Sequence, residues 1–281
     1  MNIEHIVSRR SFLGSLVAAA GGKLAAAGFK PIPLGLELYS VRHALMKDLP
    51  GTVRGVAKMG YSCVEFYGPY SQWTRGEARQ VRAELDQLGV RCHSTHNGLG
   101  SFTPQGLPQA IELNRILGAR YMVLASPGEV KDAEGWKRVA ETLNRANVTL
   151  ERNGLNAGYH NHDAEWKPAG GGKPMEILAG ALDRSIMLQL DVGTCVEAGS
   201  DPVAWIRQNP GRIRSLHLKD WSPEQGYKAL FGQGVAPWKQ IFAAAESVGG
   251  VEYYLMEQET SDGPEMEAVR QDFAAYGKLR A

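Results

Sequence analysis

The stretch LPQAIELNRILGARYMVL, residues 107–124, contains the repeating unit that predicts the fold of this 281-residue chain. Apolar residues recur at helical spacing over 107–117, Gly118 supplies a left-handed residue that ends a helix, and 121–124 is an apolar run typical of a buried strand. Similar strand-like runs recur about every thirty residues along the chain. They cover 34–38, 63–66, 90–94, 156–160, 187–190, 213–218 and 253–256.

Helical patterns lie between these runs, at 52–58, 76–88, 107–117, 136–152, 205–208 and 238–247. Alternation of strand and helix predicts a parallel sheet, and eight such units in about 250 residues fit a closed barrel better than an open sheet. We therefore predict an α/β protein in which residues 28–281 form a single (β/α)8 TIM barrel. No GxGxxG follows the first strand and no GxxxxGKS/T occurs, so a nucleotide-binding Rossmann or P-loop domain is not indicated.

Charge and cysteine content exclude other classes of protein. The formal net charge of +1 does not favour binding to nucleic acid or to an anionic membrane. The three cysteines, Cys63, Cys92 and Cys195, lie far apart and form no CxxC pair, so neither a zinc knuckle nor a disulfide scaffold is indicated. We expect all three to be plain buried thiols.

The N-terminus predicts export. The motif SRRSFLG at 8–14 resembles a twin-arginine export motif, and it is followed by a short apolar stretch and by AAA at 25–27. The apolar stretch is shorter than the roughly 20 residues that a membrane span needs. We predict an export signal over 1–27, cleaved near Ala27, transport by the twin-arginine machinery to the periplasm, and no stable membrane span. The alternative is an amphipathic N-terminal helix.

Ionisable residues stand at most of the predicted strand ends, which meet at one mouth of such a barrel. The best set of metal ligands is His160, Asp191, His217 and Glu257, on strands five to eight. Two carboxylates with imidazoles suit one divalent ion, Mn²⁺, Co²⁺, Mg²⁺, Fe²⁺ or Zn²⁺. Each residue alone has a structural explanation, as hydrogen-bonded scaffold, helix cap or solvated charge, so the hypothesis depends on all four occurring on successive strands.

Several phrases resemble the xylose isomerase-like TIM-barrel superfamily, also described as sugar phosphate isomerase/epimerase. They are GLELYSVR (35–42), GYSCVE (60–65), YHNHDAE (159–165), LDVG (190–193), LHLKD (216–220), FGQGV (231–235) and MEQ (256–258). The resemblance implies a metal-dependent isomerase or epimerase acting on a sugar or keto-sugar. Ketose 3-epimerases of this superfamily place one metal-binding glutamate on strand five and one on strand eight, as an acid/base pair. Glu257 matches the second glutamate, whereas His160 stands at the position of the first.

This departure leaves the catalytic base open among His162, Glu165 and Glu257, and His162 or Glu165 is an alternative metal ligand. The expected chemistry is removal of a proton next to a carbonyl to give an enediolate, with the metal as Lewis acid. Lys219 is expected to neutralise the enediolate, or else to form a structural ion pair with Asp220 or Glu257. The residues expected to shape a sugar pocket are Tyr39, Arg42, Glu65, Tyr67, His96 and Trp221.

One enediolate can lead to isomerisation, to epimerisation or to loss of a leaving group. The alternatives are therefore a metal-dependent lyase or hydratase acting on a 3-keto-glycoside or inosose-like substrate, and a non-catalytic sugar-binding barrel. A DNA-repair nuclease like endonuclease IV is disfavoured because the chain has no basic stripe. Export favours a free sugar, an oxidised sugar or a glycoside over a sugar phosphate. The native metal, the stereochemistry and the oligomeric state stay open.

Overall fold

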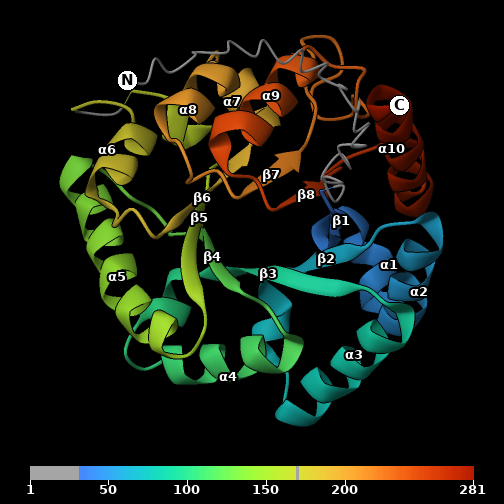
Figure 1. The fold of residues 1–281 in the computed structure, drawn as a ribbon, viewed down its shortest axis with the longest axis horizontal. Helices are drawn as coiled ribbons and strands as arrows, with labels where there is room; N and C mark the ends of the chain where they lie inside the picture. Colours follow the sequence, from blue (N-terminus) through green and yellow to red (C-terminus); the bar gives the residue numbers. More distant parts are fainter. Residues whose placement is uncertain (1–31, 169–170) are drawn as a thin grey trace, which may run out of the picture. The chain divides into compact units, whose positions relative to one another are not determined.

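The computed structural model describes residues 32–168 and 171–281, so the predicted export signal, with its cleavage near Ala27, lies outside the described residues. Each strand pairs in parallel with the next, and β8 pairs with β1, which closes the barrel (Figure 1). The strands are β1 (Leu34–Glu37), β2 (Cys63–Phe66), β3 (Arg91–Gly98), β4 (Tyr121–Ser126), β5 (Asn156–His160), β6 (Met187–Asp191), β7 (Ser215–Leu218) and β8 (Tyr253–Met256).

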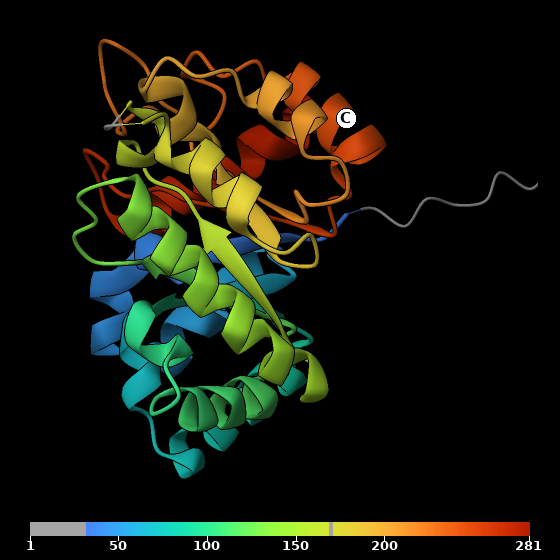
Figure 2. The same cartoon turned by 90° about the vertical axis from the view of Figure 1, so that its left-hand side faces the viewer.

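Helices surround the strands on the outside of the barrel (Figures 1 and 2). They are α1 (Arg42–Lys47), α2 (Leu49–Met59), α3 (Arg75–Leu88), α4 (Leu107–Leu117), α5 (Ala133–Arg152), α6 (Pro174–Ala181), α7 (Val192–Glu197), α8 (Pro202–Gln208), α9 (Trp238–Ala244) and α10 (Glu265–Arg280). The predicted α/β class and single (β/α)8 barrel are confirmed. Helices α1, α6, α7 and α10 were not predicted. No helix within the described ranges is long and apolar enough to cross a membrane.

The unit at 107–124 folds as its pattern predicts. Helix α4 ends at Gly118, whose φ of 78° is left-handed, and β4 begins at Tyr121. The amide of Ala119 donates to the carbonyl of Asn114 at 3.0 Å, so the last turn of the helix is closed as the chain leaves it. The chain therefore passes from helix to strand within a few residues, and each strand starts at the same end of the barrel.

Residues that face the barrel interior change from apolar to polar along the strands. Side chains alternate along a strand, so residues two apart share a face. Cys63 is followed on the inner face of β2 by Glu65. Met187 is followed on that of β6 by Gln189 and Asp191. The apolar end forms the barrel floor, a cluster of buried side chains from Cys63, Tyr121, Val123, Met187, Tyr253 and Leu255. The polar residues therefore lie toward the C-terminal mouth, where (β/α)8 barrels hold their sites.

The connection 219–237, between β7 and α9, is fastened by two buried carboxylates. Asp220 accepts a hydrogen bond from the indole Nε1 of Trp238 at 2.8 Å. Asp272 of α10 accepts one from the backbone N of Phe231 at 2.8 Å through Oδ1, whereas its Oδ2 has no hydrogen-bond partner among the described residues. Helix α10 thereby holds this connection beside the barrel mouth. The three cysteines are buried and free, as predicted.

Candidate functional site

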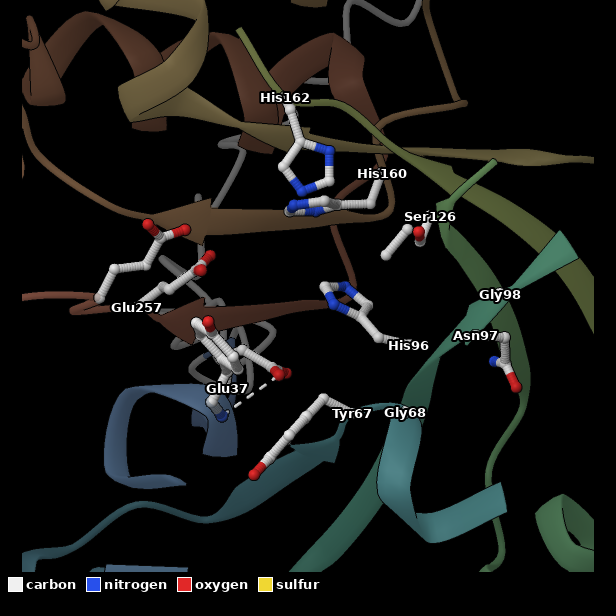
Figure 3. Close-up of a pocket in the computed structure, with 13 residues that line it drawn as sticks. Glu37, Tyr67, Gly68, His96, Asn97, Gly98, Ser126, His160, His162 and Glu257 are labelled. Carbon is white, nitrogen blue, oxygen red and sulfur yellow. Dashed lines mark hydrogen bonds between the residues drawn. The ribbon is translucent and has the colours of Figure 1, made fainter. Parts of the chain in front are cut away.

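A pocket of about 270 Å³ opens among the C-terminal ends of the strands. Figure 3 shows carboxylates on one side of it and imidazole rings on the other. Glu37 and Glu257 lie on the carboxylate side, and His96, His160 and His162 lie on the imidazole side. Glu259 also lines the pocket. The remaining lining residues are Tyr39, Tyr67, Gly68, Asn97, Gly98, Ala125 and Ser126.

The four predicted metal ligands come together here. Ligand atoms of His160, Asp191 and Glu257 all lie within 4.8 Å of one another. The Nδ1 of His217 is 2.5 Å from Oε2 of Glu257. All four side chains are buried, and two carboxylates so far from water need positive charge beside them. Mixed carboxylate and imidazole donors of this kind fit a divalent cation.

A second polar layer supports these ligands from within the barrel. The Oε2 of Glu65 lies 2.9 Å from Nε2 of His217 and 3.0 Å from Nε2 of His96. Gln189 holds His160, because its Oε1 is 3.1 Å from the Nδ1 of that ring, while its Nε2 donates to Glu65 at 3.1 Å. In each ring, the nitrogen that faces this layer can carry the proton, so the opposite nitrogen is available to bind a metal. That nitrogen is Nδ1 in His217 and Nε2 in His160, and it is directed toward the ligand set.

Burial and neighbouring charges shift the pKa values of His160 and His217 in opposite directions. Burial, together with the neighbouring His217 and His96, lowers the pKa of His160 well below its usual range, so its ring is neutral. Burial opposes the charged ring of His217, but Glu257 and Glu65 outweigh it and raise the pKa of His217 to about 10. In the absence of a cation His217 thus carries two protons, and a divalent ion must compete with the one on Nδ1.

Two of the carboxylates that line the pocket, Glu37 and Glu257, also differ in pKa. Burial and the charges of Glu65 and Glu257 raise the pKa of Glu37 well above its usual value. Burial also disfavours the ionised form of Glu257, but Lys219 and His217 outweigh it and lower the pKa of Glu257. The environment thus favours the neutral form of Glu37 and the ionised form of Glu257, a separation typical of acid/base pairs.

The three candidate residues at the end of β5 and in the connection after it lie in different surroundings. His160 faces the ligand set, and His162 lines the pocket with a side chain that is 45% exposed. Glu165 is buried behind it, where it accepts hydrogen bonds from the hydroxyl of Tyr159 at 2.7 Å and from the backbone N of His162 at 3.1 Å. Burial works against the charged ring of His162, but Glu165 outweighs it and raises the pKa of His162.

Lys219 is buried in a cage of carboxylates. Its Nζ is 2.5 Å from Glu259, 3.2 Å from Asp191 and 3.7 Å from Glu257. The ion pair with Glu257 is thus present. Asp220, the other expected partner, instead holds the 219–237 connection. The position of Lys219 suits it to offset the negative charge of the ligand set.

The residues expected to bind the sugar are divided between the pocket and its surroundings. Tyr39, Tyr67 and His96 line the pocket. The guanidinium of Arg42 lies over the ring of Tyr39, 4.4 Å from its centroid. Glu65 is fully buried and contacts His217 and His96. Trp221 lies in the 219–237 connection, outside the set of described residues that line the pocket.

Glu37 and Glu259 also line the pocket, although they were not among the predicted site residues. Glu37 is the last residue of β1, and Glu259 lies two residues beyond Glu257. Both therefore satisfy the strand-end rule that predicted the metal ligands, and applying the rule to every strand would have found them.

Comparison with known proteins identifies similar sequences. A family model described as xylose isomerase-like TIM barrel matches residues 53–279. An inosose dehydratase of Clostridium beijerinckii is 32% identical over 202 residues, and one of Geobacillus thermodenitrificans is 27% identical over 164 residues. These matches cover 72% and 52% of this chain, and 62% and 54% of the relatives' own lengths.

Solved structures share the fold over most of the chain. A sugar phosphate isomerase/epimerase from Parabacteroides distasonis is 25% identical, with a TM-score of 0.75 over 89% of this chain and 94% of that protein. A D-psicose 3-epimerase has a TM-score of 0.68 over 88% of this chain and 99% of that protein, at 13% identity. The second similarity is one of fold alone.

Proposed function

Because the chain belongs to the xylose isomerase-like TIM barrel family, we propose that it is a metal-dependent isomerase or epimerase of a sugar or keto-sugar. The observation that carries the proposal is the convergence of His160, Asp191, His217 and Glu257 beside a pocket with imidazole on the opposite side. A divalent cation held by these four residues would supply Lewis-acid polarisation of the substrate carbonyl.

The chain's own residues supply the proton chemistry in this proposal. His162 removes the proton from the carbon next to the carbonyl, because its ring is half exposed in the pocket and Glu165, which raises its pKa, stabilises the proton that the ring accepts. Glu37, a neutral carboxylic acid on the opposite side, donates a proton. Glu257 is less suited to be the base, since His217 and Lys219 stabilise its ionised form. Acid and base on opposite sides suit epimerisation.

Dehydration is the second candidate. A protonated Glu37 is also suited to protonate a departing hydroxyl group, and both curated relatives are named inosose dehydratase. Loss of that hydroxyl as water would follow the same initial proton removal.

We also propose that the export signal predicted for residues 1–27 delivers the enzyme to the periplasm, where free sugars and glycosides are the available substrates.

Metal content is the first test. Purified wild-type protein should hold about one divalent ion per chain, and the double variant Asp191→Ala with His217→Ala should hold none, because two of four donors are removed. Glu252→Ala, at the opposite end of the barrel, is the matched control and should keep the metal. A wild-type chain that neither holds nor takes up a divalent ion contradicts the proposal.

Exchange in heavy water then identifies the reaction. Metal-loaded protein is incubated with ketohexoses and with an inosose, and deuterium incorporation next to the carbonyl is followed by NMR. Deuterium in an isomerised or epimerised product supports the first candidate, and an unsaturated product supports dehydration. A metal-loaded chain that catalyses no exchange with any of them contradicts both candidates for these substrates.

Replacing Glu65 with Gln should weaken divalent-metal binding by about 10- to 100-fold. The amide presents an N–H or a weaker acceptor to Nε2 of His217, so the ring loses the partner that keeps its proton on that nitrogen. Competition with a fluorescent chelator measures the affinity, and ¹⁵N shifts of the histidine rings report the tautomer. Glu252→Gln is the control. Unchanged affinity and unchanged tautomers would show that Glu65 does not orient the ligand.

A further inference from the structure

An apolar groove lies beside the catalytic pocket, between the first two strand-to-helix connections of the barrel. One wall comes from α1 and the start of α2, and the other from the end of β2 and the turn that follows it. The groove encloses about 270 Å³, whereas an apolar cavity of about 150 Å³ is enough to hold a benzene ring. Its main lining residues are Leu45, Met46, Leu49, Phe66, Tyr67 and Trp73.

The groove and the pocket share a wall. Tyr67 lines both of them, Gly68 continues the pocket and Pro69 continues the groove. The ring of Tyr67 meets that of Tyr39 edge to face at 5.3 Å, and Tyr39 is 39% exposed at the pocket. Both connections follow the C-terminal ends of parallel strands, so both lie at the barrel mouth. A molecule seated in the pocket that reaches past the ring of Tyr67 would therefore enter the groove.

The chemistry of the groove differs from that of the pocket. Its lining residues are leucine, methionine, proline and aromatic residues, and none carries a charge. The hydroxyl of Tyr70, which also lines the groove, donates to Oδ1 of Asn97. Met46 is 70% exposed, and a flexible thioether there provides adaptable apolar contact. Such a surface disfavours sugar hydroxyls and phosphate and favours a flat apolar ring.

We propose that this groove is a subsite for an aromatic group attached to the sugar, so that the substrate is a keto-glycoside with an apolar aglycone. The proposal rests on the proposed function, because it requires the sugar to occupy the adjoining pocket. It narrows the substrate class, since a free sugar or a sugar phosphate leaves the groove empty.

A matched pair of glucosides tests the subsite without turnover. Phenyl β-D-glucoside should bind the full-length, metal-loaded protein about tenfold more tightly than methyl β-D-glucoside, because only the phenyl ring reaches the groove. Isothermal titration gives both affinities. Met46→Glu should remove the advantage of the phenyl ring and leave methyl glucoside binding unchanged. Val148→Glu, which places the same charge on an exposed apolar position of α5, should keep the advantage.

Equal affinities in the wild type, binding of neither glucoside, or an advantage that survives Met46→Glu would each overturn the subsite. Wild-type dimers that dissociate in Met46→Glu, with both glucosides bound equally, would assign the groove to a second copy of the chain. The metal and exchange measurements report on the proposed function separately, so failure there and failure of the subsite are distinguishable.

Discussion

Replacing Glu257 with Gln should lower the rate of deuterium exchange into the substrate about 10³-fold. The Oε2 of Glu257 is 2.5 Å from Nδ1 of His217, and its Oε1 is 3.7 Å from Nζ of Lys219. This ionised carboxylate therefore contacts both positively charged side chains of the site. The amide removes the negative charge, so His217 and Lys219 lose their charged partner on this side. Exchange followed by NMR under saturating metal measures the effect.

Glu252→Gln is the matched control for this variant. Glu252 directly precedes β8 and Glu257 directly follows it, so Glu252 lies at the opposite end of the barrel; its Oε1 accepts a hydrogen bond from the hydroxyl of Tyr121. Its exchange rate should stay within about twofold of the wild type, because residues at the end of the barrel away from the mouth contribute to stability and not to the chemistry. A Glu257→Gln protein that exchanges within tenfold of the wild type, with metal bound, would remove Glu257 from the site.

Stability should depend on pH through Asp272. Burial is the main cause that raises the pKa of Asp272 to about 7, from an ordinary value of 3.8 in the unfolded chain. Between these two values the folded state binds the extra proton, so the free energy of unfolding falls as the pH rises. Since one pKa unit corresponds to about 1.4 kcal/mol, the contribution of this group should fall by about 4 kcal/mol between pH 4 and pH 8.

Urea unfolding of the wild type and of Asp272→Asn measures this contribution. The asparagine variant does not titrate, so its stability relative to the wild type should increase from pH 5 to pH 8. Taking the difference between the two proteins cancels the titration of the carboxylates and histidines at the mouth. A difference that is the same at both pH values would mean that Asp272 ionises normally in the folded chain.

The fold was predictable because its strands are short apolar runs separated by helices that end at glycine. The unpredicted helices lack the pattern on which that reasoning depends. Helix α6 reads PMEILAGA and is apolar on nearly every side, so it has little helical periodicity, and α1 and α7 span only six residues each. Helix α10 has apolar residues spread around it and shows only a weak apolar stripe.

The site was predictable to the level of strand ends and no further. Glu65 was expected to contact a sugar, yet it is fully buried and contacts His217 of β7 and His96 of β3. How deep a side chain lies depends on the stagger between strands when the barrel closes, and spacing along the chain does not contain it. Glu165 shows the same limit, because a short helical turn at Ala164–Trp166 directs it back toward Tyr159.

The closed barrel floor bears on the order in which a metal ion and a substrate would bind. Its six buried side chains close the end of the described barrel opposite the mouth, so an ion, a sugar and water share one entrance. Asp191 and His217 are outside the set of described residues that line the pocket, so an ion held by them would be reached through the pocket. The ion would then bind before the sugar and dissociate after it. A bound substrate would therefore slow the removal of the metal by a chelator.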